Sequence, residues 1–137
     1  MKKQNLLRND DGFTLVEIIA VLIILGILAA VAVPRYIDLE RSARERGLDA
    51  AVAELNGRES LVWAAVKISP TGYADWGEDA GVLAEMTTGN HWDLGPEYEW
   101  DGGVPSSGGT ATLTFQGVAT RDLTRTASDT TTPATWQ

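Results

Sequence analysis

One carboxylate, Glu17, stands in a run of residues that otherwise has the composition of a membrane span. The sixteen residues that follow it, Ile18 to Val33, carry no charge. Residues 13–33 would form about 31 Å of helix, which matches a hydrocarbon core of roughly 30 Å. An ionisable group at bilayer depth costs about 2.5–3.5 kcal/mol or more unless a partner pairs with it. Glu17 is therefore a candidate functional residue, and its chemistry is that of an ion pair formed in apolar surroundings.

Catalysis has little support in the other residues. The chain has no cysteine and a single histidine, His91, and it contains no Ser-His-acid spacing, phosphate-binding glycine loop or HExxH zinc motif. We expect no enzyme activity and no cofactor, and we expect His91 to be a surface or hydrogen-bonded loop residue.

An acidic cluster near the middle of the chain could supply oxygen ligands to calcium. Alternation along a strand would place three of its members on one face, but the spacing is not that of an EF-hand loop. A solvated acidic face is the favoured interpretation, with calcium as a weak alternative. The candidates are Asp93, Glu97, Glu99 and Asp101.

Two residues within the apolar run weaken a helix by different routes. Gly26 adds backbone entropy, and Pro34 lacks an N–H and crowds the carbonyl of Ala30. In lipid the backbone groups must stay paired, so a helix should persist there with at most a kink. The segment from Gly26 to Pro34 is thus the place where the helix could unwind, although close helix packing at Gly26 and a simple bend at Pro34 would also explain both residues.

Beyond Pro34 the pattern changes to that of an amphipathic helix. The pairs Glu40/Arg44 and Arg41/Glu45 have i,i+4 spacing on its outer face, and Ser69-Pro70 should end it. The apolar stripe consists of Leu48, Ala51, Val52, Leu55, Val62, Ala65 and Val66. We therefore predict one helix from Phe13 to Ile68, with a hydrophobic half (residues 13–34) and an amphipathic half (residues 35–69).

Residues 70–137 have the composition of a small β-rich domain, with ten of the fourteen glycines and many threonines. Period-two alternation predicts strands at 97–101 and 110–115, joined by the loop 102–109. Gly117 should mark a bulge or strand end, residues 118–123 a third strand, and residues 92–94 an edge pairing. The threonine-rich end is expected to be a poorly ordered polar tail, with an exposed glycosylated surface as the alternative. About 68 residues with few large apolar side chains need the apolar stripe of the helix to complete a core. The predicted fold class is α+β, with a small antiparallel sheet packed on the second half of a long helix.

The N-terminal motif resembles that of the type IV pilins and the related pseudopilins of type II secretion. The resemblance covers about the first 55 residues and rests on a glycine before a phenylalanine, a glutamate five residues into the mature chain, and the later glycine and proline, namely Gly12, Phe13, Thr14, Leu15, Glu17, Gly26, Pro34 and Tyr36. This sequence departs from many pilins in lacking a C-terminal cysteine pair, and Asp10 and Asp11 dilute the basic charge of the leader.

The resemblance implies a structural role for the chain. A leader, residues 1–12, would be removed after Gly12 by a prepilin peptidase that also methylates the α-amine of Phe13, and the subunits would then polymerise through their N-terminal helices. The implied partners are that enzyme, inner-membrane assembly machinery, membrane lipid before assembly, and further copies of the chain. Glu17 and Phe13 would be the assembly residues, and Gly26 to Pro34 would melt in the filament. The implied locations are the inner membrane, as a single-pass protein, and then an extracellular pilus, associated with adhesion or motility.

Other interpretations remain open at this stage. A secretory signal peptide could use the same apolar run with cleavage after Ala30-Val31-Ala32, but it would leave Glu17 without a purpose. The chain could be a pseudopilin of a secretion system, or a ligand-binding domain on a signal anchor. Nucleic acid is not an expected partner, because the chain carries a formal net charge of −8, and removing three basic and two acidic leader residues would leave −9.

Overall fold

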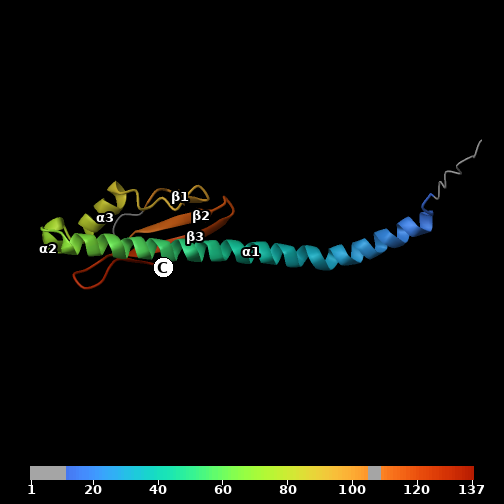
Figure 1. The fold of residues 1–137 in the computed structure, drawn as a ribbon, viewed down its shortest axis with the longest axis horizontal. Coiled ribbons are helices and arrows are strands. Elements are labelled where there is room, and N and C mark those ends of the chain that lie inside the picture. Colours follow the sequence, from blue (N-terminus) through green and yellow to red (C-terminus); the bar gives the residue numbers. More distant parts are fainter. Residues whose placement is uncertain (1–11, 105–108) are drawn as a thin grey trace, which may run out of the picture. The chain divides into compact units, whose positions relative to one another are not determined.

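The computed structural model describes residues 12–104 and 109–137, so the expected leader lies, except for Gly12, outside the described residues. The chain divides into two compact units, residues 1–39 and residues 40–137. The helix α1 (Leu15–Ile68) begins in the first unit and ends in the second (Figure 1).

The ends of α1 follow from local chemistry. At its start, the side-chain oxygen of Thr14 accepts a hydrogen bond of 3.2 Å from the backbone N–H of Glu17, which is the bond that an N-cap residue makes. At its end, the hydroxyl of Ser69 donates to the carbonyl of Val66 at 2.7 Å, and Pro70 cannot extend the ladder. The prediction of one long helix that ends at Ile68 is confirmed, with a start two residues later than expected.

In the second unit, an antiparallel sheet lies along α1 (Figure 1). Its strands are β1 (Tyr98–Asp101), β2 (Thr110–Phe115), β3 (Ala119–Thr126) and β4 (Thr135–Trp136), in the order β1-β2-β3-β4. Leu113 pairs with Trp100 on one side and with Arg121 on the other. The β2–β3 turn places Gln116 and Gly117 at positive φ, 53° and 66°, as tight hairpin turns require. Gly117 therefore lies in the turn just after β2 ends at Phe115, in agreement with the expected strand end.

The core forms between the sheet and the apolar stripe of α1. Leu113 and Leu123 of the sheet and Leu55 of α1 are fully buried, and the small helix α3 (Asp79–Thr88) adds Val82 and Met86. The buried apolar residues of α1 are Leu48, Ala51, Leu55, Val62 and Val66; Val52 is half-buried and Ala65 is exposed. The predicted α+β class is confirmed.

Two local expectations for the segment after Pro70 are wrong. The chain after Pro70 forms two helices, α2 (Gly72–Trp76) and α3. The sequence did not predict them, because the glycines between residues 72 and 89 disfavour helix. Residues 92–94 form no strand, and Trp92 is instead buried, with its carbonyl accepting a bond from Trp100 Nε1 at 3.0 Å.

The C-terminal segment is not a loose polar tail. Its β4 pairs with β3, and Trp136 is buried against Trp92 and Trp100, with ring centroids 5.6 Å away in each case. Asn56 of α1 binds the backbone of Trp136 through two hydrogen bonds, accepting from its N–H at 2.6 Å and donating to its carbonyl at 3.1 Å. The buried ring of Trp136 thus holds in place a segment whose other residues have the composition of a polar tail.

Candidate functional site

The Gly12–Phe13 peptide precedes the helix and is exposed on both sides of the bond. Gly12, Phe13 and Thr14 lie outside α1, and 78% of Phe13 is exposed. A Cβ added at Gly12 would meet no atom within 4 Å, so packing among the described residues does not demand glycine there. Exposed, irregular backbone of this kind is where proteases cut. Cleavage at this bond stays a prediction.

Glu17 occupies the first turn of α1, three residues after the capping Thr14. Thr-x-x-Glu is the sequence of a capping box, and the partial positive charge at a helix N-terminus favours an acid there. Glu17 therefore also stabilises the N-terminal end of α1. Its carboxylate nevertheless has no hydrogen-bond or ion-pair partner among the described residues, since the bond to Thr14 uses its backbone N–H. An ion-pair partner would have to come from outside this part of the chain.

The first unit presents apolar side chains around its whole helix. From Phe13 to Leu39 the exposed fraction of each large hydrophobic residue lies between 45% (Ile18) and 78% (Phe13). By length and composition this part of α1 could cross a membrane. A helix that is hydrophobic on all sides needs an apolar environment, either lipid or other protein chains.

The helix is continuous through the segment that was expected to be weak. Gly26 and Pro34 both lie within α1, and a Cβ added at Gly26 would meet no atom within 4 Å. Close packing inside a single chain therefore does not explain Gly26. Melting of this segment in an assembled state stays a prediction.

Sequence reasoning missed a buried ionic cluster in the second unit, Glu59, Asp79 and Arg125. Glu59 lies in the apolar stripe between Leu55 and Val62, and it and Arg125 are almost fully buried. Arg125 donates to Glu59 at 2.6 and 3.1 Å and to Asp79 at 2.9 and 3.0 Å. A signal was available: the stripe runs from Leu55 to Val62 with Glu59 at the intervening helical position, and a carboxylate there requires a buried cation.

The cluster joins four elements of the second unit. Glu59 belongs to α1, Asp79 begins α3 and Arg125 belongs to β3, while Trp136 of β4 donates from Nε1 to Glu59 at 3.2 Å. Asp79 also accepts hydrogen bonds from the backbone N–H and the hydroxyl of Ser128, at 2.7 and 2.8 Å. Burial acts to lower the pKa of Arg125, but hydrogen bonds to Glu59 and Asp79 outweigh it and hold the pKa above its usual range. Arg125 is therefore always charged, and the role of the cluster is to hold these four elements together.

The structure does not gather the calcium candidates into one metal-binding group. No group of three or more acidic, histidine or cysteine residues able to hold a metal occurs in the described ranges 12–104 and 109–137. Asp93 instead accepts a hydrogen bond from the backbone N–H of Gly95 at 2.9 Å, while Glu99 and Asp101 lie on the exposed side of β1. The carbonyl of His91 accepts a bond from Arg58 at 2.9 Å, which makes His91 a hydrogen-bonded loop residue, as expected.

Comparison with known proteins gives a match to a family model and a match to one curated protein. Residues 7–33 match the model of the prokaryotic N-terminal methylation motif. A segment of 60 residues is 40% identical to the type IV narrow pilus major component PilA5 of Thermus thermophilus, covering 44% of this chain. The chain spans about half the length, 52%, of this curated relative. No solved structure matches.

Proposed function

We propose that this chain is a member of the type IV pilin family and a structural subunit of a pilus-like filament. Its methylation motif and its similarity to a pilus component support this proposal. The subunit is held in the inner membrane by the hydrophobic half of α1, cleaved after Gly12 and methylated on the α-amine of Phe13. It then polymerises through residues 13–34. Its role is structural rather than catalytic.

The observation that carries this proposal is the carboxylate of Glu17, which has no hydrogen-bond or ion-pair partner among the described residues and stands at the start of a helix with apolar side chains on every side. Lipid satisfies the apolar surface, but a filament core made of such helices satisfies it too. Transfer from one environment to the other leaves the hydrophobic contribution nearly unchanged, because lipid tails are as apolar as the side chains of a neighbouring helix. Polar interactions must then set the arrangement of the helices.

Glu17 supplies such an interaction once the leader has been removed. The newly formed α-amine of Phe13 is cationic, and methylation retains its charge. A buried carboxylate is tolerated only when paired, and removing one partner of a buried pair is strongly destabilising. If Glu17 of one subunit pairs with the Phe13 amine of a neighbour, cleavage becomes a prerequisite for docking. A slip of one helical turn would bury both charges unpaired, so the pair also sets the axial register.

Mass spectrometry of filaments sheared from the cell surface tests the proposal. The expected subunit begins at Phe13 and carries one methyl group on its α-amine. A Gly12→Val variant, whose β-branched side chain hinders access to the scissile bond, should remain uncleaved in the membrane and should be missing from filaments. A mature subunit that began at Val33 would instead establish a signal peptide and exclude the proposed function.

A deletion strain separates the pilus subunit from the pseudopilin alternative, because the two roles predict the loss of different functions. Long surface filaments that contain this chain support the pilus subunit, whereas loss of protein secretion in a deletion strain, without surface filaments, would support a pseudopilin.

A further inference from the structure

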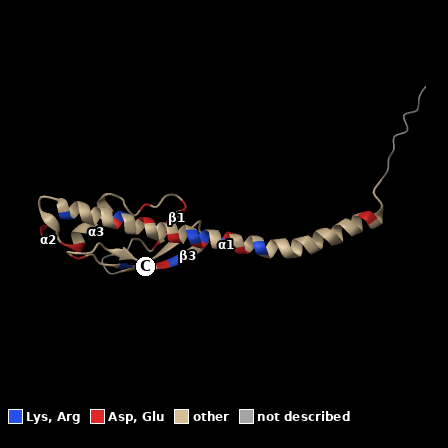
Figure 2. Cartoon of the chain, turned by 60° about the horizontal axis from the view of Figure 1, so that its bottom comes forward, with Lys and Arg blue, Asp and Glu red and all other residues tan. Residues whose placement is uncertain are grey.

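The mature chain has an uneven distribution of charge. Residues 70–120 contain no lysine or arginine, and their acidic residues are Asp75, Glu78, Asp79, Glu85, Asp93, Glu97, Glu99 and Asp101. By contrast, four arginines occur between residues 35 and 46, and two more, Arg121 and Arg125, follow the acidic stretch. Figure 2 shows basic residues in blue on α1 and near β3, with acidic residues in red beside them.

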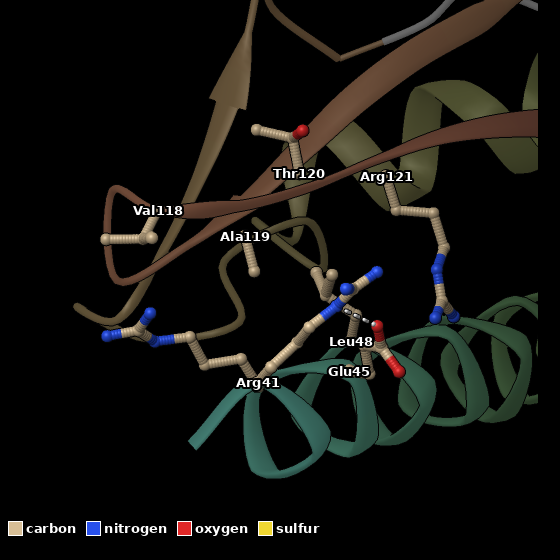
Figure 3. Close-up of a pocket in the computed structure, with 8 residues that line it drawn as sticks. Arg41, Glu45, Leu48, Val118, Ala119, Thr120 and Arg121 are labelled. Carbon is tan, nitrogen blue, oxygen red and sulfur yellow. Dashed lines mark hydrogen bonds and ion pairs between the residues drawn. The ribbon is translucent and has the colours of Figure 1, made fainter. Parts of the chain in front are cut away.

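Three of these arginines line a groove of about 360 Å³ in the second unit. Arg41 and Arg44 come from α1, while Arg121 comes from the start of β3, just after the β2–β3 turn. Figure 3 shows Arg41 and Glu45 on the helix opposite Val118, Thr120 and Arg121 of the hairpin. The groove therefore has guanidinium groups on both walls and one acidic residue, Glu45, in its lining.

The ion pairs that these arginines make leave donors free. Arg41 binds Glu45 through Nε at 3.2 Å, Arg44 binds Glu40 through one terminal nitrogen at 2.6 Å, and Arg121 binds Asp49 through one terminal nitrogen at 2.6 Å. Exposed pairs of this kind are weak, and a guanidinium has five N–H donors. Arg44 Nε is buried and has no hydrogen-bond partner among the described residues. A buried atom is out of reach of an incoming chain, but the side chain of Arg41 is 80% exposed and binds Glu45 only through Nε, so its terminal N–H groups are available to an acceptor.

An acidic surface of matching spacing exists on the same chain. Glu99 and Asp101 are the two exposed residues of β1, whose other two residues, Tyr98 and Trp100, are partly buried. Residues two apart on a strand lie about 6.7 Å apart along it, and the arginines at i and i+3 on α1 have Cβ atoms about 5–6 Å apart. Among the described strands β1 lies at one edge of the sheet.

We propose that this arginine groove binds the outer acidic face of β1 in a second copy of the chain, through Glu99 and Asp101. The groove and the strand are different surfaces, so the contact is heterologous, and a bound pair of copies leaves one groove and one strand free for the next copies. A heterologous contact does not close a dimer, and it extends into an open helical assembly when its rotation does not close a ring. The contact rests on the proposed filament, to which it adds a second, water-exposed set of subunit contacts.

Cross-linking in the full-length chain tests the contact directly. The chain contains no cysteine, so an introduced pair can react only with itself. Thr120→Cys combined with Glu99→Cys, treated on intact filaments with a short bifunctional maleimide reagent, should give a ladder of covalent dimers and higher oligomers. Thr120→Cys combined with Asp75→Cys is the matched control, because Asp75 is an exposed acid on α2, and it should give no ladder. Intact filaments with no ladder from the first pair, or with equal ladders from both pairs, would overturn the proposal.

Charge reversal gives an independent measurement. Arg41→Glu and Glu99→Arg should each lower the yield of sheared filaments about tenfold, because like charges face each other across the contact, and the two together should restore much of the yield. Asp75→Arg changes the charge by the same amount away from the contact and should leave the yield unchanged. Immunoblots of the membrane-held subunit report whether each variant folds and accumulates.

The two proposals fail in distinguishable ways. If the wild-type chain never occurs in sheared filaments, the proposed function is wrong. If wild-type filaments form, and both reversals leave their yield unchanged while the cross-link is missing, only the groove contact is wrong.

Discussion

Replacing Arg125 by alanine should destabilise the second unit far more than the same change at Arg121. Both arginines lie on β3 and both bind a carboxylate of α1 at 2.6 Å, Arg125 to Glu59 and Arg121 to Asp49. They differ in burial, since the side chains of Arg125 and Glu59 are 0% exposed, whereas those of Arg121 and Asp49 are 34% and 66% exposed. They also differ in that Arg125 binds a second carboxylate, Asp79. For the carboxylate of α1, the comparison holds element, partner type and distance constant.

The size of the effect follows from what the truncation leaves behind. Arg125→Ala removes four charge-assisted hydrogen bonds. Asp79 keeps its two bonds from Ser128, but Glu59 keeps only the one from Trp136, at 3.2 Å. Breaking a buried pair by removing one partner costs about 3–5 kcal/mol, while an exposed pair contributes about 0–1 kcal/mol. Since domains are stable by about 5–15 kcal/mol, the first change removes a large fraction of the total.

Urea unfolding of the detergent-solubilised full chain, followed by tryptophan fluorescence, measures this difference. Trp92, Trp100 and Trp136 lie together beside the cluster and report on its integrity. With a slope near 2 kcal/mol per molar urea, Arg125→Ala should lower the unfolding midpoint by about 2 M and Arg121→Ala by less than about 0.5 M. The combination of Arg125→Met with Glu59→Met should recover part of the loss, because it leaves no unpaired carboxylate at position 59.

Equal midpoints for Arg125→Ala and Arg121→Ala would refute this reasoning. That result would mean that Glu59 reaches water or becomes neutral at little cost, and that packing alone holds α1, α3 and β3 together.

Four further outcomes are expected. Glu17→Gln should permit membrane insertion and folding of the second unit but sharply reduce filaments in sheared fractions, and filaments in wild-type amount and symmetry would exclude the ion pair. Pro34→Ala should extend regular helix in a filament map and make the filament less extensible, because it restores an N–H donor to the ladder; a wild-type map with unbroken helix up to this residue would exclude melting. Gly81→Ala should lower the free energy of unfolding by about 1–3 kcal/mol, since its Cβ would overlap the side chain and carbonyl of Trp76. Gly57→Ala should instead raise the free energy of unfolding by about 0.5–1 kcal/mol, because Gly57 lies in mid-helix and an added Cβ meets no atom within 4 Å. Hydrogen bonds from Thr131 and Thr132 lower the pKa of Asp129 to about 2. The stability that this carboxylate adds is therefore present above its unfolded pKa near 3.8 and is lost as the pH falls towards 2. NMR titration of its side-chain resonances measures this pKa, and a value near 3.8 in the folded chain would contradict the prediction.

The sequence by itself determined the long helix, the motif around Glu17 and the α+β class. These features are local: an uninterrupted apolar run, i,i+4 charge pairs and a Ser-Pro stop each act within a few residues of the chain, so their consequences can be deduced without knowing the fold. The amphipathic stripe predicted the face of α1 that the sheet covers, and period-two alternation located β1 and β2 to within one residue.

Only the tertiary structure decided which distant residues meet. Arg125 and Glu59 are 66 positions apart, and Trp136 and Asn56 are 80 apart. No periodicity along the chain encodes such pairings, because they depend on how the sheet lies on the helix. The buried cluster, the anchored C-terminal strand and the arginine groove all arise from that packing. Their energies are large where water is excluded and small where it is not, and this is why Arg121 and Arg125, four residues apart on one strand, have such different expected effects.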